Sequence, residues 1–522
     1  MTDPHQSPTA AHGARVPNVS PAGVPLRRVI DALTRAGLLA EARGALPDAV
    51  ASIADDSRRV ESGTLFVAVR GSQQDGHTFL ADAERRGAAV ALVENATATA
   101  LPTLVVRGGR RAAAVAAAAF YDDPASSLTL VAVTGTNGKT TTVGMLRHLL
   151  DAPGRPTASL GTLGVLAGSA GEPVPGGAGL TTPGPVELQR VLRVLADRGV
   201  RAVAMEVSSH ALDQRRVEGV SFEAAVFTNL TRDHLDYHGT MDAYFAAKAR
   251  LLEYLRPTGA AVINADDPAW AALVPTGRPS TYSPTGSAAA DVAAVAPTFG
   301  PDGSTFTLRV AGAAVAARVP LIGDFNVANA LAAAATALAL GMPLDDVVLR
   351  LGTLPQVPGR LERLLDRPAV LRDYAHTPDA LERALRAVRP FARGRLIVAF
   401  GAGGDRDRGK RPEMGRVAQA LADQVILTSD NPRTEDPERI LDDIEAGMGQ
   451  GMHERVEDRR SAIARALALA GPDDVVLLAG KGHETYQIRG TETLPFDEAE
   501  IVRELTEVAL GRQDERAPAV TG

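Results

Sequence analysis

The stretch Val131-Ala-Val-Thr-Gly-Thr-Asn-Gly-Lys-Thr-Thr141 decides the fold of the central part of this chain. Residues 128–133 are mostly apolar and β-prone, which predicts a buried strand. Residues 140–150 predict a helix, so Gly135 and Gly138 lie in the turn between strand and helix. Glycines let backbone N–H groups approach phosphate oxygens, the helix N-terminus carries partial positive charge, and Lys139 adds a full charge. The stretch therefore predicts that the chain binds a nucleoside triphosphate.

The loop is shorter than the usual G-x-x-x-x-G-K-[ST] pattern, so an ordinary glycine turn with a solvated lysine is the alternative. The strand before it and the helix after it favour the phosphate site. In such a site Thr140 is placed to offer its hydroxyl group to Mg²⁺.

Composition limits the class of protein. A chain of 522 residues is too long for one core and predicts about three domains. The net charge is −7 without a basic block, which does not indicate a nucleic-acid partner. The absence of cysteine excludes disulfides and fits a reducing compartment. The apolar runs are too short to span a bilayer and the N-terminus has no signal pattern. We expect a cytoplasmic monomer without membrane insertion.

The order of predicted elements indicates an α/β protein of three domains. We expect a small α/β unit at residues 25–127, a central phosphate-binding unit with a mostly parallel sheet at 128–354, and a Rossmann-like unit at 355–510. Residues 1–24 and 511–522 are expected to be disordered tails. In the first unit, small polar residues such as Ser57 lie beside the predicted strands 64–69 and 88–93. They suit ligand recognition and turn formation equally well.

Strands of the central unit end in polar residues. Residues 201–207 lead into Glu206 and Ser208, and residues 224–228 lead to the segment that contains His234. Ligands of open α/β sheets sit at the carboxyl ends of the strands, so these side chains are site candidates. Glu206 would contribute negative charge for Mg²⁺ and His234 an imidazole; turn capping is the alternative for either residue alone.

Lys248 lies on the apolar face of a helix predicted for residues 241–252. Tyr244 precedes it by four positions and Leu252 follows it by four. The residues alone favour a lysine that snorkels to solvent. The alternative is a buried role, in which desolvation lowers the pKa and favours a neutral amine that can react with carbon dioxide to form a carbamate.

Further polar motifs follow. Asn326 and Asn329 share one face at the start of an alanine-rich helix and suit a base or a phosphate, although Asn326 also suits an N-cap. In the third unit the predicted strands 395–400, 424–428 and 475–479 each end in a polar turn. Three units with polar strand ends imply a reaction that runs between domains.

Taken together, these motifs resemble those of the Mur ligase family, the ATP-dependent amide-forming enzymes of peptidoglycan synthesis. The resemblance covers residues 24–510, and the family motifs occur in the family order. They are Thr134-Gly-Thr-Asn-Gly-Lys-Thr-Thr141, the segments of Glu206 and His234, Gly323-x-Phe325-Asn326-x-x-Asn329, Pro358-Gly-Arg360 and Asp373-Tyr-Ala-His376. Within the family, Asp430-Asn431-Pro432-Arg433 matches the enzymes that add meso-diaminopimelate to UDP-N-acetylmuramoyl-L-alanyl-D-glutamate.

The resemblance implies a role for each matching residue. Catalysis would fall to Lys139, Lys248, His234, Glu206 and Arg360. ATP would be held by Gly135, Thr136, Asn137, Gly138, Lys139, Thr140, Thr141, Asn329, Arg360 and Asp373. The UDP-muramoyl dipeptide would be held by Ser57, Ser72, Gln73, Gln74, Thr181, Thr182, Ser208, Gln214 and Arg216. Diaminopimelate would be held by Arg406, Asp430, Asn431, Pro432, Arg433, Gly480 and Glu484. Mg²⁺ would be bound by Thr140, Glu206, His234 and Lys248, the last as a carbamate (N6-carboxylysine). For Lys248 the resemblance therefore favours a buried, modified side chain over one that snorkels to solvent.

The implied reaction passes the γ-phosphoryl group of ATP to the D-glutamate side-chain carboxylate, and an amine of diaminopimelate then attacks the acyl phosphate. Three alternatives remain. A lysine-adding relative shares the chemistry, but Arg433 argues against it. A folate-polyglutamylating ligase would lack the N-terminal unit and the stretch from Asp430 to Arg433. A nucleotide-dependent binding module would need the phosphate loop but not three polar sheet edges.

Overall fold

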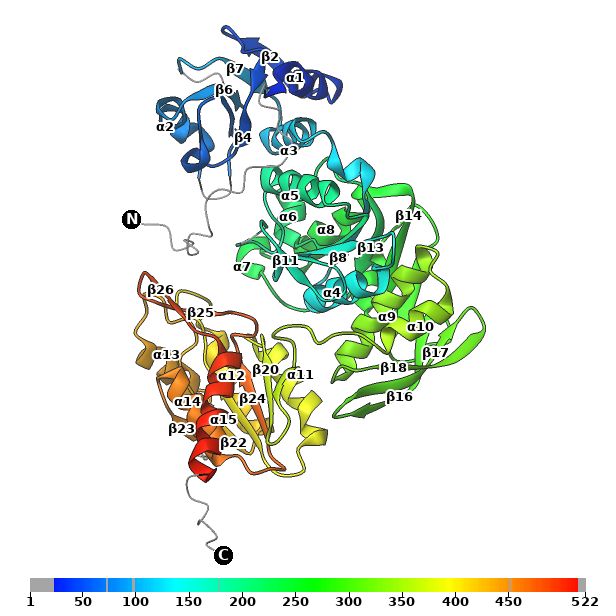
Figure 1. Ribbon diagram of the computed structural model, residues 1–522, viewed down its shortest axis with the longest axis vertical. Helices are drawn as coiled ribbons and strands as arrows, with labels where there is room; N and C mark the ends of the chain where they lie inside the picture. Colours follow the sequence, from blue (N-terminus) through cyan, green and yellow to red (C-terminus); the bar gives the residue numbers. More distant parts are fainter. Residues whose placement is uncertain are drawn as a thin grey trace, which may run out of the picture.

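Three β-sheets of five or more strands, each covered by helices, follow one another along the chain in the computed structural model (Figure 1). The structure describes residues 23–71, 74–95, 99–177, 179–449, 451 and 453–514. Each sheet is mostly parallel with antiparallel strands at an edge, so the predicted α/β class with three units is confirmed.

The first unit holds a five-stranded sheet in the order β2-β7-β6-β5-β4, in which only β2 is antiparallel to its neighbour. Apolar side chains of α1 and α3 pack on it with Phe120 and Tyr121 in the same cluster. The predicted strand at 88–93 is observed with the same bounds. The strands are β1 (Val24–Pro25), β2 (Leu39–Arg43), β3 (Ala49–Val50), β4 (Ser52–Ala54), β5 (Thr64–Ala68), β6 (Ala88–Val93) and β7 (Thr103–Val106). The helices are α1 (Leu26–Arg35), η1 (Ser57–Arg59), η2 (Gly76–Phe79), α2 (Leu80–Arg85) and α3 (Gly109–Phe120).

The central unit is built on an eleven-stranded sheet in the order β11-β10-β9-β12-β8-β13-β14-β15-β16-β17-β18. The strands from β9 to β16 run parallel, and the outer strands at both ends are antiparallel. The strands are β8 (Thr129–Thr134), β9 (Thr157–Gly161), β10 (Gly164–Ala167), β11 (Glu172–Val174), β12 (Ala202–Glu206), β13 (Phe222–Phe227), β14 (Leu255–Asn264), β15 (Ser280–Ser283), β16 (Val292–Gly300), β17 (Gly303–Val310) and β18 (Ala313–Val319). The helices are η3 (Pro124–Ser127), α4 (Lys139–Leu150), α5 (Pro185–Asp197), α6 (Ser209–Asp213), α7 (Leu235–His238), α8 (Met241–Ala249), η4 (Arg250–Tyr254), η5 (Pro268–Ala272), α9 (Asp324–Ala339) and α10 (Leu344–Leu351).

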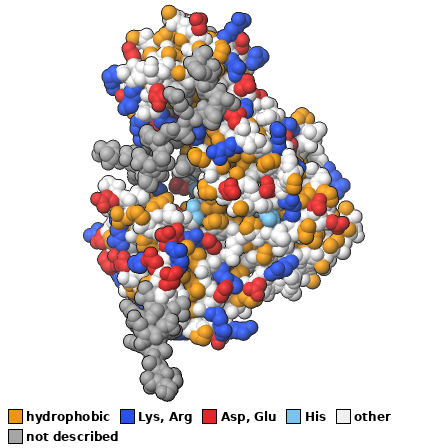
Figure 2. All heavy atoms as spheres, in the orientation of Figure 1, with side chains coloured by type: hydrophobic (Ala, Val, Ile, Leu, Met, Phe, Trp, Pro, Cys, Tyr) orange, Lys and Arg blue, Asp and Glu red, His pale blue; other side chains and the backbone are white. Residues whose placement is uncertain are grey.

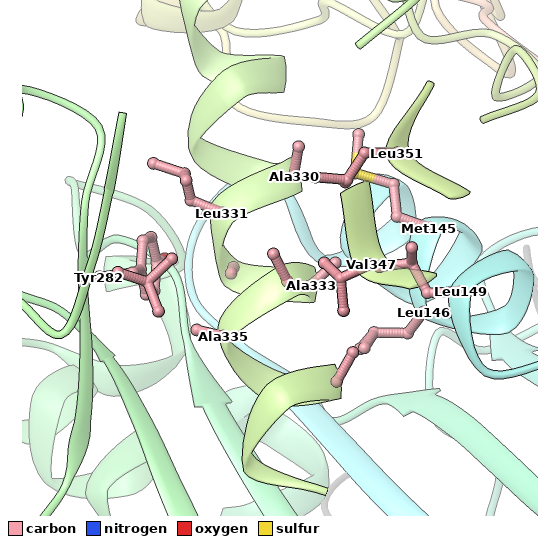
Figure 3. Close-up of a cluster of buried hydrophobic side chains, with 14 of the residues drawn as sticks. Met145, Leu146, Leu149, Tyr282, Ala330, Leu331, Ala333, Ala335, Val347 and Leu351 are labelled. Carbon is pink, nitrogen blue, oxygen red and sulfur yellow. The ribbon is translucent and has the colours of Figure 1, made fainter. Parts of the chain in front are cut away.

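Helix α9 forms the centre of the main core. Its alanine side chains are small, so α4 and α10 pack closely against it, with Met145, Leu149 and Val347 filling the space between the helices (Figure 3). On the other face of the sheet, α5 and the apolar side of η4 form a second core. Helices therefore cover both faces of the parallel strands, as a parallel sheet requires.

The third unit holds a six-stranded sheet in the order β19-β20-β24-β21-β22-β23, with β19 antiparallel. Helices α11, α12 and α13 pack on one face, and α14 and α15 on the other. The strands are β19 (Glu362–Leu365), β20 (Ala369–Asp373), β21 (Leu396–Phe400), β22 (Gln424–Leu427), β23 (His453–Arg455), β24 (Val475–Ala479), β25 (Tyr486–Arg489) and β26 (Glu492–Pro495). The helices are α11 (Pro378–Val388), η6 (Arg389–Phe391), α12 (Lys410–Leu421), α13 (Pro437–Glu445), α14 (Arg459–Leu469) and α15 (Glu498–Asp514).

Some predicted boundaries differ from the observed ones. Helix α15 continues to Asp514, so the tail expected from residue 511 is wrong in its first four residues; residues 515–522 and 1–22 lie outside the described part of the chain. Residue 24, also expected in a tail, pairs in β1. The helix predicted for 241–252 ends at Ala249 and continues as the 3₁₀ turn η4, because a tighter turn replaces the last α-helical turn.

The visible surface carries interspersed positive and negative side chains with scattered hydrophobic ones (Figure 2). Within the described residues, no helix is long and apolar enough to cross a membrane.

Candidate active site

The phosphate loop leaves the end of β8 and enters α4, in the middle of the central sheet. Gly135 and Gly138 have φ values of 148° and 86°, which disfavour other residues. A Cβ atom on Gly135 would lie 1.9 Å from Oγ1 of Thr228, and one on Gly138 would lie 2.3 Å from Oδ1 of Asn329. Asn229 fixes the loop from the neighbouring strand, because its Oδ1 accepts from the N–H of Asn137 (2.9 Å). Glycine is therefore required where the loop meets β13 and α9.

Two lysines converge on this loop. The ammonium group of Lys139 donates to the carbonyl oxygens of Gly135 (2.9 Å) and Thr136 (2.8 Å). The ammonium group of Lys248 donates to the same Gly135 oxygen at 2.7 Å. Burial lowers the pKa of Lys139, and the charge of Glu206 acts in the opposite direction.

Lys248 does not reach solvent. Its side chain is 1% exposed, and its nitrogen lies 4.6 Å from the ring centroid of Tyr244. The interpretation that Lys248 snorkels to solvent is therefore wrong, because the loop after β8 covers this face of α8. Burial and the nearby charge of Lys139 bring the pKa of Lys248 well below its ordinary value, which favours the neutral amine.

The candidate residues for binding Mg²⁺ would supply oxygen and nitrogen ligands, but only a small number of carboxylates. Among the described residues, no group of three or more His, Cys, Asp and Glu side chains is arranged to hold a metal ion. Mg²⁺ usually keeps several waters and is bound through one or two carboxylates and substrate phosphates. The Glu206 carboxylate at the end of β12 and the hydroxyl of Thr140, at the start of α4, fit that pattern.

Glu206 is held by a residue that the sequence did not single out. Its two carboxylate oxygens accept from the backbone N–H (2.8 Å) and the hydroxyl (3.2 Å) of Thr162. His234 begins α7 with a φ of 52°, and its Nε2 lies 3.4 Å from Asp233. Burial lowers the pKa of His234. Such a backbone conformation in a non-glycine residue is often found at functional sites.

The third unit contributes to the same edge of the central sheet. Arg360, in the link between the two units, donates to the hydroxyl of Thr140 (3.3 Å) and lies over the ring of Tyr374 (4.7 Å). Asp373 ends β20, and its carboxylate accepts from the backbone N–H groups of Leu361, just before β19, and Ala375, so both oxygens are engaged with backbone groups.

Asn329 lies one turn inside α9 and touches the phosphate loop. Its amide oxygen accepts from Thr142 (3.4 Å), and its NH₂ donates to Asn326 (3.3 Å). Asn326 does not cap the helix, since Gly323 holds the N-cap position and the Asn326 amide donates to the carbonyl of Ile322.

The residues expected to hold the muramoyl dipeptide form one network around Thr182. The Thr182 hydroxyl donates to the Glu206 carbonyl (2.9 Å) and accepts from the N–H of Ser208 (3.1 Å). Arg216 donates to the Thr182 carbonyl (2.9 Å) and twice to the Gln214 side chain. Thr181 lies within hydrogen-bond distance of Thr162 (3.3 Å). The network therefore adjoins the candidate metal ligand.

The residues expected to hold the UDP part lie in the first unit. Ser57 is buried at the start of η1. Gln74 is exposed, and its carbonyl accepts from the N–H of Gly71. Ser72 and Gln73 lie outside the described residues.

Two arginines from different loops of the third unit lie close together. Arg433 donates to the Gly404 carbonyl (2.9 Å) and has a φ of 53°. Burial and the charge of Arg433 lower the pKa of Arg406, whose guanidinium donates to the carbonyl of Asp405. Among the described residues, neither guanidinium has a carboxylate oxygen within 4.0 Å. Glu435, two positions after Arg433, pairs with Arg408 and Arg411 instead.

The other amino-acid candidates surround a lysine that the sequence reasoning did not select. Asn431 donates to Glu484 (2.8 Å) and accepts from Lys481 (3.1 Å). Gly480 has a φ of 113°, and a Cβ atom there would lie 3.1 Å from the carboxylate of Asp430. Asn431 and Pro432 are buried, whereas Arg433 is half-buried. Lysine is rare in this chain, because only four of its 55 lysine and arginine residues are lysines. That rarity is a signal by which the sequence could have singled out Lys481.

Comparison with known proteins agrees with this arrangement. Residues 133–337 match the Mur ligase middle domain, residues 359–482 the Mur ligase glutamate ligase domain, and residues 50–130 the Mur ligase family catalytic domain. The chain belongs to the Mur ligase family.

Particular members are similar over nearly the whole chain. The UDP-N-acetylmuramoyl-L-alanyl-D-glutamate–2,6-diaminopimelate ligase of Synechococcus elongatus is 47% identical, covering 91% of this chain and 98% of that protein. The ligase of the same name from Geobacter metallireducens is 44% identical, covering 90% and 98%. A solved structure of an enzyme of that name is 35% identical with a TM-score of 0.63, covering 89% and 96%. MurF from Acinetobacter baumannii, at 21% identity, TM-score 0.63 and coverage of 93% and 99%, shares the fold.

Proposed function

We propose that this chain is an ATP-dependent ligase that joins meso-2,6-diaminopimelate to the D-glutamate side-chain carboxylate of UDP-N-acetylmuramoyl-L-alanyl-D-glutamate. The observation that carries the proposal is the pair of arginines, Arg406 and Arg433, which have no carboxylate partner in the described structure; Arg433 lies in the same turn as the buried carboxylate of Asp430. That arrangement suits an amino acid with a distal carboxylate and a distal ammonium group. The names and extent of the similar ligases support the same reaction.

In the first step a carboxylate oxygen of the dipeptide attacks the γ-phosphorus of ATP. The bond to the β-phosphate oxygen breaks, and ADP leaves with that electron pair. Lys139 and the backbone N–H groups of the loop would hold the phosphates, and Arg360 would move from Thr140 to the transferring phosphoryl group. These groups act by positioning and by offsetting negative charge.

In the second step a neutral amine of diaminopimelate attacks the acyl carbon. The C–O bond to phosphate breaks, inorganic phosphate leaves, and the amine loses one proton. The network around Thr182 would hold the dipeptide beside the phosphate loop, and the loops of Asp430 and Gly480 would hold the amine. Since these groups lie on different units, the reaction requires both units to face one another.

When bound, Mg²⁺ would supply positive charge beside the phosphates. Glu206 and the hydroxyl of Thr140 suit one ion, while His234 and a carbamate on Lys248 suit a second. A carbamate forms only on a neutral amine, and the lowered pKa of Lys248 supports that modification. Cytoplasmic location and a monomeric state stay predictions.

The test is phosphate release from ATP with each substrate alone and with both. We expect phosphate only when the UDP-dipeptide and diaminopimelate are both present, and a product heavier by one diaminopimelate residue. Equal phosphate release with L-lysine would favour the lysine-adding relative. If neither amino acid gave phosphate release in the presence of the UDP-dipeptide, the ligase assignment would be contradicted.

A further inference from the structure

A lysine that the proposed mechanism does not use lies between the amino-acid loops. Lys481 follows β24 and its side chain is 0% exposed. Its ammonium group donates to Oδ1 of Asn431 (3.1 Å) and to the Tyr486 carbonyl (2.7 Å). Carboxylate oxygens of Asp430 and Glu484 lie 3.6 and 3.5 Å from the same nitrogen. One buried cation therefore lies within 4.0 Å of the side chains of Asp430, Asn431 and Glu484.

Lys481 decides which way the Asn431 amide faces. An ammonium group can only donate, so the amide oxygen must face it. The N–H of Ile488 donates to the same oxygen at 3.0 Å. The amide NH₂ is thereby turned to Glu484, to which it donates at 2.8 Å. Without the ammonium group, one of the two donors that hold this orientation would be lost.

The charges of the cluster do not balance. Two carboxylates, Asp430 and Glu484, face one ammonium group. In the described structure, Oδ1 of Asp430 is buried without a hydrogen-bond partner. Burial and the charge of Asp430 raise the pKa of Glu484, and Lys481 acts in the opposite direction. A second ammonium group, brought by a substrate, would supply both the missing charge and the missing donor.

We propose that Lys481 is a positioning residue of the amino-acid site. Its ammonium group orients Asn431 and lies between the carboxylates of Asp430 and Glu484, so that two carboxylates around one ammonium group leave one unbalanced negative charge for the retained ammonium group of the incoming amino acid. The inference rests on the proposed function for the identity of that amino acid.

The residue type fits this role. This chain uses arginine in nearly all its cationic positions, and the four lysines are Lys139, Lys248, Lys410 and Lys481. A lysine ammonium is a compact charge with three rotatable donors, whereas the planar guanidinium of arginine presents its donors in a fixed fork. A closed space bounded by four acceptors in different directions suits the ammonium group.

Other ionisable groups face the cluster. They come from the ends of β20 and β22, from β25 and from α12, and they are Tyr374, His376, Arg433, Tyr486 and Lys410. Only Lys481 contacts both carboxylates within 4.0 Å among the described residues.

The test compares Lys481→Met, which removes the donors and the charge, with Lys481→Gln, which keeps a donor without charge. Arg395→Met is the control, because Arg395 pairs with Asp474 at the opposite edge of the same sheet. We expect the KM for diaminopimelate to rise by about tenfold or more in both Lys481 variants. The KM for ATP and the values for the control should stay within about twofold of wild type.

The pH dependence separates a charge role from a merely structural one. Without Lys481, Glu484 holds its proton to higher pH, so the ratio of the variant KM to the wild-type KM for diaminopimelate should fall as pH rises. A wild-type KM in the folded Lys481→Met protein, or wild-type behaviour of Lys481→Gln, would overturn the proposal. An equal rise in the KM for ATP and for diaminopimelate would do the same.

A substrate-free measurement keeps this inference separate from the proposed function. When the pKa of a carboxyl group is higher in the folded state than in the unfolded state, the protein loses stability as pH rises from the unfolded-state pKa to the folded-state pKa. Loss of the neighbouring cation raises the folded-state pKa further, so the loss of stability continues to higher pH. The difference in Tm between wild type and Lys481→Met should therefore grow as pH rises. The difference in Tm between wild type and Arg395→Met should not change with pH. If the difference in Tm between Lys481→Met and wild type did not change with pH, the proposed role of the Lys481 charge would be overturned. If the wild-type enzyme were inactive with diaminopimelate, only the proposed function would be contradicted.

Discussion

Lys139 and Lys248, which lie 109 positions apart, donate to the same backbone oxygen, that of Gly135 (2.9 and 2.7 Å). Two ammonium groups that share one acceptor repel each other; Lys248 is buried and Lys139 is half-buried. The repulsion is relieved if one of them becomes neutral or changes sign. A carbamate on Lys248 would place a negative group beside Lys139 and remove the conflict.

Carbamylation of Lys248 is therefore the first prediction. Lys248→Ala should leave the enzyme nearly inactive, and a short carboxylic acid should restore part of the activity by supplying the missing anion. Phosphate release measures both effects. Lys410→Ala treated with the same acid is the control for a general effect of the acid. An unmodified amine at position 248 in a high-resolution map of active enzyme would contradict the prediction.

Lys139→Ala should lower turnover by about a hundredfold or more, because the phosphates lose their nearest fixed cation. The measurement is ADP formation with both substrates present. The fold should be retained, since in the described structure Lys139 donates only to carbonyl groups of its own loop. Turnover close to wild type would show that the loop does not serve phosphate transfer.

Arg433→Ala should lower kcat/KM for diaminopimelate by about a hundredfold or more and leave the KM for ATP unchanged, because a distal carboxylate loses a charge-assisted contact. The exposed residue Arg439 offers a matched control six positions further along the chain. Competition between diaminopimelate and lysine reports the specificity directly. If Arg433→Ala still prefers diaminopimelate, the selectivity arises elsewhere.

Closure between the central and third units is the last prediction. Asn137 donates to Asp379 (3.4 Å) and Arg360 to Thr140 (3.3 Å), so long hydrogen bonds bridge the units at the phosphate loop. Phosphate binding would draw Arg360 towards the nucleotide. Small-angle scattering should show a smaller radius of gyration with a non-hydrolysable ATP analogue and both substrates. The same radius with and without ligands would indicate a permanently closed form.

The sequence by itself determined the units whose signals are contiguous. The apolar run of β8, the glycine turn and α4 form one segment, and β6 and β24 have the predicted bounds. Hydrophobic periodicity and turn residues act over a few positions, so they are readable without any knowledge of the tertiary structure. The polar turns that begin at Asp430 and Gly480 were predicted in the same way, as residues that follow buried strands.

Tertiary structure alone decided what covers each side chain. Periodicity places Lys248 on the apolar face of its helix, but only the packing of α8 against the loop after β8 distinguishes a buried lysine from a snorkelling one. The sheet order β24-β21-β22 is not the chain order, and it brings Lys481 to Asn431 across 50 positions. A sequence pattern reports which side of an element is apolar or polar. The partner on that side depends on contacts between distant segments, which no local pattern contains.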